Sequence, residues 1–382
     1  MSELHTDKRT RLHLLVRDRI LNMVIRSGWR RGDPLPSYRE LTERFGVSLV
    51  TIQRAMDELI KDGTVCGWPG RGTFLERDLT PQVRKLTQIG LVMNCSRKTF
   101  FSSSYLMEIF QGVMLQSEEL NLDVRLCSIK SDGTLTPRQL SESGIDGVLL
   151  LGVSNDEYIA EVVRELSPVV VVDHSSSAVA TDYVVCNNDL ALTSLVSHLT
   201  GLGHRCIAFA GGWTTDTIAD LQGRNPNIES TVSISRRNAF KAAMYHAKLS
   251  GQAVMFPVPA GPYASNEAAV QAWKDADPKP TAIIVSGAGQ AAGLIEEFER
   301  NGVRVPLDVS IAGAAGAGND AIAGRLVLTH HRVHFIDMGR KAVSILSERC
   351  GEVRPQKAQV SRIGSELIVG TSTAAARLPL PL

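Results

Sequence analysis

The first part of the chain carries apolar residues at helical spacing. Four of them repeat every four positions and predict an opening helix over about residues 10–27. These residues are Leu12, Val16, Ile20 and Val24. The run at 32–36 reads Gly-Asp-Pro-Leu-Pro and cannot continue that helix, because a proline lacks an amide hydrogen and restricts the residue before it.

Two short helices and a hairpin are predicted next. Ser37 and Glu40 have the spacing of a capping box, and Gly46 breaks the chain before a third helix that Ser48 caps. The third helix has one apolar face that we expect to be buried, made of Ile52, Ala55, Met56, Leu59 and Ile60. Segments 64–68 and 73–75 are predicted wing strands, with their tip at 69–72. The pattern therefore predicts a winged helix-turn-helix.

This segment resembles the DNA-binding head of the GntR family of bacterial transcription regulators. The resemblance rests on P-S-x-R-E-L at 36–41, G-V-S at 46–48 and G-R-G-T-F at 70–74, and it implies duplex DNA as a partner. The family's recognition helix usually carries two arginines where this chain has Leu49 and Gln53, and Arg54 stands where glutamine is more common. Arginine prefers guanine and glutamine prefers adenine, so the operator is expected to differ from the family's common ones.

The DNA contacts are expected from the recognition helix and the wing. A recognition helix presents its N-terminal residues to base edges in the major groove, and Arg39 matches the arginine that the family aligns toward DNA. Glycines at the wing tip let the backbone approach a phosphate, and Arg71 is suited to a narrow minor groove. The predicted DNA-binding residues are Ser37, Arg39, Ser48, Leu49, Thr51, Gln53, Arg54, Arg71 and Gly72. The alternative for each polar residue is a solvated helix face.

Beyond a polar stretch at 78–87, short apolar runs alternate with helical segments. The runs lie at 88–93, 123–127, 147–151, 169–172, 206–210, 253–257, 281–285 and 309–312. Helices are predicted between them at 105–120, 157–166, 190–201, 236–249, 264–276 and 288–301. This alternation predicts an α/β domain with parallel sheets and helices on both faces. The segment is too long for one such sheet, so we expect two lobes, with a ligand in the crevice at the carboxyl ends of the strands.

The order of motifs in this second part resembles the effector domain of the LacI/GalR family, which is itself similar to periplasmic sugar-binding proteins. Its motifs include I-G-L-V at 89–92, G-I-D-G-V-L-L-L-G at 144–152, P-V-V-V-V-D at 168–173 and R-x-x-A-F at 236–240. A GntR-type head on such a domain is the arrangement of the arabinose-repressor group. The predicted domains are the head at 1–77, a linker at 78–87, and an effector-binding and dimerisation domain at 88–372, with lobes at 88–188 plus 333–360 and at 189–332 plus 361–372.

The LacI/GalR resemblance implies three effector-binding candidates. Asp173 aligns with an aspartate that faces the crevice, and Arg236 aligns with an arginine that bonds ligand hydroxyls or a carboxylate. Trp213 could stack on a ligand face, or it could simply pack in its loop. An interlobe salt bridge is the alternative for Arg236. The family's other polar ligand positions are Gly287, Ala288, Ala315 and Val333 here, so the effector is expected to differ from a simple sugar, or the site to be vestigial.

Two further features resemble functional sites. Residues 286–293 lie between a strand and a helix, but they lack the G-K-[ST] of a phosphate loop and the G-x-G-x-x-G of a dinucleotide site. A helix start rich in small residues is favoured, although its N–H groups could still receive a carboxylate or phosphate. His330, His331 and His334 suggest a metal cluster, but no Asp, Glu or Cys completes it at useful spacing. Solvent-facing or interlobe histidines are favoured.

The overall composition adds little to this picture, but the distribution of charge along the chain is informative. The whole chain has a net charge of +1, whereas residues 1–77 hold 14 Lys and Arg against 10 Asp and Glu, a local excess that suits a DNA-binding head. Six cysteines without C-x-x-C spacing fit free thiols in a reducing cytoplasm. No apolar run reaches the length of a membrane span, and no secretory segment is seen. We expect a cytoplasmic protein without a cofactor or metal.

The sequence therefore predicts a ligand-responsive transcriptional regulator that acts as a repressor of carbohydrate-related genes. A homodimer is expected to bind two-fold operator DNA, with a sugar or sugar derivative as effector. One alternative is a DNA-binding regulator whose effector site is vestigial or not a sugar site. The other is a small-molecule-binding protein or enzyme with a relic head, although no nucleophile–base set is visible.

Overall fold

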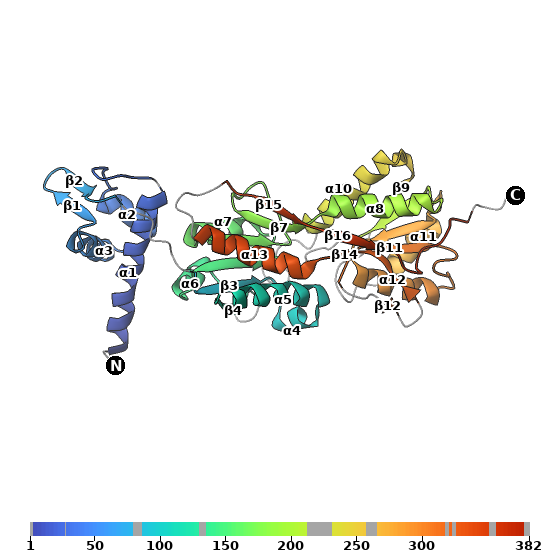
Figure 1. Cartoon of the computed structure of the whole chain (residues 1–382), viewed down its shortest axis with the longest axis horizontal. Helices are drawn as coiled ribbons and strands as arrows, with labels where there is room; N and C mark the ends of the chain where they lie inside the picture. The colour runs from blue at the N-terminus through green and yellow to red at the C-terminus, as the bar shows by residue number, and fades with distance from the viewer. Residues whose placement is uncertain are drawn as a thin grey trace. The chain divides into compact units, whose positions relative to one another are not determined.

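The computed structural model describes residues 3–26, 28–78, 86–129, 135–211, 231–256, 266–317, 321–322, 326–350 and 357–377. These residues form two compact units, one built mainly from the first 85 residues and the other from residue 86 onward (Figure 1). The first unit is the head, and the second unit contains two lobes.

The head is a helix-turn-helix with a wing. Its helices are α1 (Glu3–Arg26), α2 (Tyr38–Phe45) and α3 (Leu49–Lys61), and its antiparallel hairpin joins β1 (Val65–Trp68) to β2 (Gly72–Leu75). The capping box of Ser37 and Glu40 is present, Gly46 ends α2 in the left-handed conformation with φ of 62°, and Ser48 caps α3. The predicted N-caps of α2 and α3 and the predicted break at Gly46 are therefore confirmed.

Apolar side chains from all three helices and the wing fill the core of the head. The largest contributions come from fully buried residues, namely Ile20, Leu41, Ile52, Met56 and Leu59. Ile60 departs from the predicted stripe, since it is 41% exposed. Eight residues of an α-helix turn through about 80° beyond two full turns, so Ile60 lies at the margin of the face that Ile52 centres.

The first lobe is built on a six-stranded parallel sheet with the order β15-β7-β6-β5-β3-β4. Its strands are β3 (Gln88–Met93), β4 (Asp123–Ser128), β5 (Gly147–Leu151), β6 (Val169–Val172), β7 (Asp182–Cys186) and β15 (Val360–Ile363). Its helices are α4 (Arg97–Ser102), α5 (Ser104–Glu119), α6 (Pro137–Glu142), α7 (Asp156–Glu165) and α13 (Phe335–Cys350). The central strands β5 and β6 are buried along their whole length, as continuous Val and Leu runs require in a parallel sheet.

The second lobe repeats this architecture with the order β16-β14-β11-β10-β8-β9, in which β16 alone runs antiparallel to its neighbour. Its strands are β8 (Ile207–Ala210), β9 (Ala253–Phe256), β10 (Ala282–Val285), β11 (Ser310–Gly316), β14 (Thr329–Val333) and β16 (Ser365–Ile368). A short pair, β12 (Ala321–Ile322) and β13 (Leu326–Val327), lies outside that sheet. Its helices are α8 (Asn188–Gly201), α10 (Thr231–His246), α11 (Glu267–Asp275) and α12 (Ala288–Arg300), with a 3-10 turn at Ser250–Gln252.

The chain crosses between the lobes at three described places. Asn187 joins β7 to α8, His334 joins β14 to α13, and Gly364 joins β15 to β16. Hydrogen bonds tie these crossings together: the Asn187 amide donates to the Ile363 carbonyl at 3.1 Å, and the His334 amide donates to the Gly364 carbonyl at 3.3 Å. Since β15 pairs with β7 as far as Ile363, the first sheet continues three residues beyond the predicted crossing after residue 360.

Two glycines bring α5 and α13 into close contact on the first lobe (Figure 1). A Cβ on Gly112 would lie 1.9 Å from the carbonyl oxygen of Ile336, and a Cβ on Gly339 would lie 2.1 Å from that of Ile109. Only glycine permits backbones to approach this closely. The helix that returns from the second lobe is therefore fixed to the first lobe through backbone contact.

Candidate DNA-binding face and effector site

The N-terminal half of α3 presents a mixed apolar and polar surface. Leu49 is 48% exposed, and Gln53 and Arg54 are exposed as well. The Ser48 hydroxyl is engaged in the helix cap, where it lies 2.8 Å from the Thr51 hydroxyl and accepts the Thr51 amide. Ser48 and Thr51 are thus held in place by each other, while Gln53 and Arg54 extend into solvent where a base edge could meet them.

The wing tip and the start of α2 carry the other predicted contact residues of the head. Gly70 and Gly72 have φ of 74° and 106°, so both occupy the conformation that glycine favours, and Arg71 between them is exposed. The Arg71 amide donates to the Trp68 carbonyl at 2.9 Å and closes the turn. Arg39 also extends from the surface, and among the described residues an exposed ion pair to Glu43 at 3.3 Å holds it. Such a pair is weak enough to exchange for a phosphate.

Sequence reasoning missed two exposed apolar side chains on the head. Val50 is 56% exposed at the start of α3, and Trp68 is 55% exposed on β1, where its indole N–H donates to the Cys66 sulfur at 3.2 Å. Val50 follows Leu49 directly, so the two form an apolar pair suited to contact with a thymine methyl group. The sequence already indicated this exposure. Val50 lies off the apolar stripe of α3, and Trp68 lies outside the apolar alternation of the wing.

Polar side chains from both lobes converge beside the first crossing. Arg236 on α10 is only 7% exposed. Its guanidinium donates to the Asn188 side-chain oxygen at 3.2 Å and to the Ser286 carbonyl at 2.8 Å. Asn188 in turn donates to the Ser235 hydroxyl at 3.0 Å. Arg236 is therefore a buried cation whose orientation is fixed from two sides.

Asp173 faces this arginine from the carboxyl end of β6. It has φ of 61°, an uncommon conformation that aspartate tolerates better than most residues. Burial raises the pKa of Asp173 to about 6, although the positive charge of Arg236 opposes the rise. Burial also raises the pKa of the neighbouring Cys186 thiol to about 12 and the pKa of Tyr105 still further, with Asp173 adding to both. The cluster thus pairs one fixed cation with a carboxyl group that titrates near neutral pH.

A second network holds the loop that carries Asp173. Asp156, at the start of α7, lies 3.4 Å from the His174 ring nitrogen Nε2 and accepts the Ser176 hydroxyl at 2.7 Å. Burial lowers the pKa of His174, against the opposing effect of Asp156, so the buried imidazole favours its neutral form. A cavity of about 90 Å³ adjoins this loop and is lined in part by Asp173, Cys186 and Asn188.

Apart from Trp213, the other positions predicted for the effector site are apolar. Ala288 and Ala315 are buried, and Val333 is buried at the end of β14, so none offers a side-chain polar group to a ligand. Trp213 lies outside the described residues. Of the three effector candidates, the structure therefore brings together Asp173 and Arg236.

The structure also describes the two segments that resembled a metal cluster and a phosphate loop. His330 and His331 are buried in β14, so they are not solvent-facing, and His331 bonds the Ser365 hydroxyl at 2.8 Å. His334 is 43% exposed at the crossing from β14 to α13, as the expectation of a solvent-facing or interlobe histidine allows. In the described part of the chain no three potential metal ligands come together. The segment after β10 does begin a helix, since Gly287 is the N-cap of α12.

Comparison with known proteins separates the same two parts of the chain. Residues 13–75 match the family model "Bacterial regulatory proteins, gntR family", and residues 196–373 match the periplasmic binding protein-like domain. The arabinose metabolism transcriptional repressor of Geobacillus stearothermophilus is 25% identical across 94% of this chain and 97% of its own length. The transcriptional repressor MelR of Bacillus subtilis is 26% identical over 56% of this chain and 59% of its own.

The chain therefore carries a GntR-type DNA-binding domain and a periplasmic binding protein-like domain. The regulator's fold is shared by a LacI transcriptional regulator of Bacillus cereus, with a TM-score of 0.62 at 20% identity over 76% of this chain and 99% of that structure. A regulator solved as a CelR–cellobiose complex covers 87% of the chain and 94% of its own, with a TM-score of 0.59 at 18% identity. The predicted recognition and fold class are confirmed.

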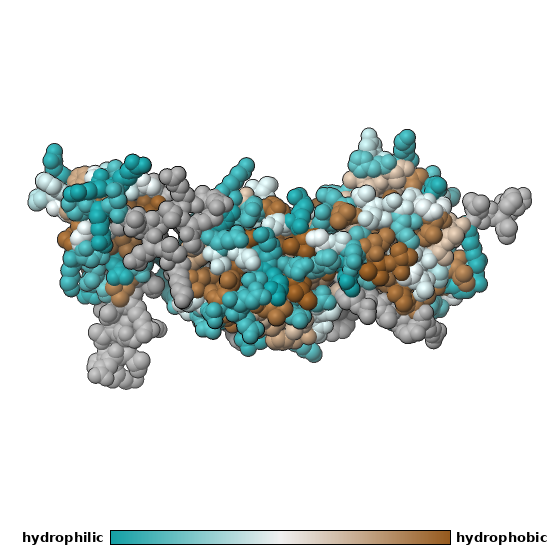
Figure 2. Space-filling view, viewed as in Figure 1, coloured by the Kyte–Doolittle hydropathy of each residue, from teal (hydrophilic) through white to brown (hydrophobic). Residues whose placement is uncertain are grey.

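These findings make the protein a ligand-responsive, DNA-binding transcriptional regulator and not an enzyme. Within the described residues, no helix is both long and apolar enough to span a membrane. Figure 2 shows hydrophilic and hydrophobic residues side by side over the visible face.

Proposed function

We propose that this regulator is a repressor of carbohydrate-related genes that binds its operator through α3 and the wing. The predicted DNA-binding residues supply the contacts, with Gln53 and Arg54 reading base edges and Arg39 and Arg71 positioned toward the phosphates and the minor groove. A homodimer would place two heads on a two-fold operator in the cytoplasm. The named repressors of arabinose metabolism and the MelR relative support the direction of regulation.

The effector is proposed to bind between the lobes at Asp173 and Arg236. The observation that carries this proposal is the buried Arg236 guanidinium, which α8 and the end of β10 orient from the second lobe while Asp173 approaches from the first. A buried arginine with spare N–H donors opposite a carboxyl group is suited to a ligand that carries several hydroxyl groups, because each side chain can bond more than one of them.

Effector and operator affinities are then coupled through the lobes. A ligand that contacts both Asp173 and Arg236 favours the closed arrangement over the open one, and it changes the equilibrium only by its differential affinity for the two. If the two arrangements hold the paired heads at different separations, ligand and DNA change each other's affinity by the same factor, and they weaken each other when the operator fits the open arrangement. Release of the operator on effector binding is the expected outcome.

A second candidate is a regulator whose effector is not a simple sugar or whose site is vestigial. It is favoured by Ala288, Ala315 and Val333, which replace polar groups of the family's ligand site with buried apolar side chains. A cleft with fewer hydrogen-bonding groups discriminates less among sugars and suits a ligand with an apolar face.

The two candidates are separated by selecting operators from a randomised duplex library with and without pools of sugars, sugar acids and glycosides. A symmetric site whose occupancy falls with one pool member supports the inducible repressor, and thermal shift with that member should show the stabilisation that mass action requires. The Arg236→Lys variant is the test of the site, since it keeps the charge but loses the planar fork. A symmetric site that no pool member affects favours the second candidate, and the absence of any enriched site contradicts the DNA-binding proposal.

A further inference from the structure

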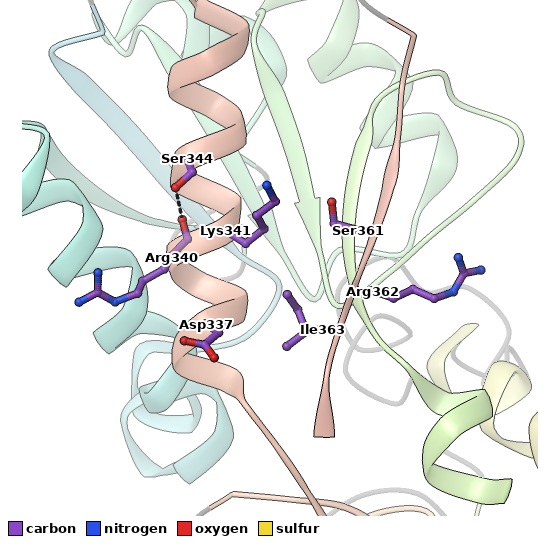
Figure 3. A pocket seen from close by; sticks show the side chains of 7 residues that line it. All are labelled: Asp337, Arg340, Lys341, Ser344, Ser361, Arg362 and Ile363. Atoms are coloured by element: carbon purple, nitrogen blue, oxygen red, sulfur yellow. Dashed lines mark hydrogen bonds between the residues drawn. The ribbon is translucent and has the colours of Figure 1, made fainter. Parts of the chain in front are cut away.

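A hollow of about 540 Å³ opens on the first lobe between α13 and β15 (Figure 3). Asp337 and Lys341 line it from the helix and Ile363 lines it from the strand, while Arg340 is held by Glu119 at 2.8 Å. Because both signs of charge meet there, the hollow does not favour one kind of ligand. The apolar side chains exposed on the recognition helix are more selective in what they can contact.

Val50 points directly away from the core at the start of α3. It precedes the fully buried Leu59 by nine residues, which is two and a half turns of an α-helix, so the two side chains leave the helix in opposite directions. Val50 is accordingly 56% exposed. Leu49 precedes the buried Met56 by seven residues, close to two full turns, and therefore lies at the margin of the core. The centre of the outer face thus belongs to Val50, which is absent from the predicted DNA-binding residues.

Two polar side chains flank Val50 on the next turn. Gln53 and Arg54 follow it by three and four residues, so they lie on either side of it, and both are exposed. Asp57, also exposed, follows Val50 by seven residues and lies in line with it on the second half of the helix. A carboxylate there repels phosphate, so DNA contact is confined to the part of α3 that carries Val50, Gln53 and Arg54.

A valine at this place is suited to one chemical group of the major groove. Base edges present hydrogen-bond donors and acceptors there, and the 5-methyl group of thymine is the apolar exception. A valine pressed against another base would bury a polar group without a partner, which costs free energy. Valine in a helix also has one strongly preferred χ1 rotamer, so the two methyl groups of Val50 do not move aside as those of a longer side chain can.

We propose that Val50 is a specificity-determining residue of this regulator, which reads the methyl group of one thymine in each operator half-site. Gln53 and Arg54 read the base pairs on either side of that thymine, with the preferences of glutamine for adenine and arginine for guanine. This contact rests on the proposed binding of α3 to the operator and names the group that the helix recognises. A 5-methylcytosine presents a methyl group at the same place, so methylation of a cytosine there strengthens binding.

The test uses the full chain and duplexes that it selects from a randomised library. Each thymine of a selected duplex is replaced in turn by uracil, which lacks only the methyl group, and affinity is measured by fluorescence anisotropy. At one position of a half-site, uracil should weaken binding about fourfold, as the burial of one methyl group predicts. When both half-sites carry uracil at that position, the loss should be about fifteenfold.

Variants of α3 establish whether Val50 makes the contact. Val50→Ala should bind the thymine and uracil duplexes equally, and it should remain folded because alanine favours a helix more than valine does. Val50→Thr keeps one methyl group and should retain part of the discrimination. Ile60→Ala is the matched control, since Ile60 is an exposed apolar residue near the other end of the same helix, and it should keep the full ratio of affinities.

The outcomes separate the methyl contact from the binding of α3 to the operator. If no duplex is enriched, both are contradicted. An enriched duplex in which no uracil weakens binding contradicts the methyl contact alone, and so does a uracil effect that persists unchanged in Val50→Ala. A duplex with cytosine at the thymine position should gain about fourfold in affinity on 5-methylation, and the absence of any gain would also count against Val50 as the reader.

Discussion

Replacing Asp173 with asparagine removes a carboxyl group from the buried cluster and keeps the shape of the side chain. Asparagine also tolerates the φ of 61° that this position requires. Burial raises the pKa of Asp173 from 3.8 to about 6 in the folded protein. The difference, at about 1.36 kcal/mol for each pH unit, corresponds to at most about 3 kcal/mol by which the ionised carboxylate destabilises the effector-free fold.

The sign of the pH dependence follows from the direction of this shift. Because the folded pKa is above the unfolded one, the contribution of Asp173 is fully favourable below pH 3.8 and is lost as the pH rises through about 6. Asp173→Asn has no such loss. The free energy of unfolding of the wild type should therefore fall relative to that of the variant by about 1.4 kcal/mol between pH 5 and pH 8.

Urea unfolding at a series of pH values, followed by circular dichroism, measures this difference. Asp123→Asn is the matched control, since it removes a carboxylate from an exposed position at the start of β4 in the same lobe. Parallel pH profiles for the wild type and Asp173→Asn would refute the reasoning, because they would mean that Arg236 fully compensates the burial of the carboxylate. A wild type that gains stability over the variant at high pH would refute it more strongly.

Three further predictions concern the head and the helix contact. Arg54→Ala should cost about 1–3 kcal/mol of discrimination at one operator base pair in a sequence-selection assay, whereas Arg39→Ala should weaken all sequences similarly and lower the salt slope of binding by about one. Ser48→Ala removes the cap of α3 and should lower the unfolding free energy of the head by about 1 kcal/mol in urea melts. Gly339→Ala places a Cβ 2.1 Å from the Ile109 carbonyl oxygen and should lower the free energy of unfolding by about 1–3 kcal/mol or more. Gly201→Ala on α8, whose Cβ meets nothing within 4 Å, is the control and should raise it by about 0.4–1 kcal/mol. Equal thermal shifts for the two alanine variants would contradict the close contact between α5 and α13.

The head could be predicted almost completely because its signals are local. The capping box at Ser37 and Glu40, the glycine at 46 and the wing glycines each act within a few residues, so sequence spacing is sufficient to place them. The prediction for Ile60 was wrong because this residue lies at the edge of the apolar face of α3. Burial at that edge depends on which neighbouring element packs against it.

The lobes were predicted less completely because part of their structure depends on distant partners. β7 begins with a buried aspartate, whose carboxylate accepts the Gln359 amide, and β14 contains two buried histidines. Neither strand has the plain apolar run that identifies β5 or β6, and their register is set by β15 and β16, which follow more than 170 and 30 residues later. The period of apolar residues alone does not reveal a strand whose polar side chains form hydrogen bonds with main-chain groups far away in the sequence.

The candidate effector site illustrates the same division between chemistry and environment. Residue type and motif order were enough to select Asp173 and Arg236, but not to show that Asn188 and the Ser286 carbonyl already occupy part of the Arg236 guanidinium. A ligand that pairs with this arginine must therefore use its remaining donors or displace Asn188, whose release also frees the Ser235 hydroxyl on α10. Since Asn188 follows the first crossing directly, a ligand that displaces Asn188 would act on a segment that joins the two lobes. Under the proposed function, the buried Ala288, Ala315 and Val333 offer no polar side chain to the effector, which would leave the Arg236–Asn188 contact to carry effector binding to the crossings.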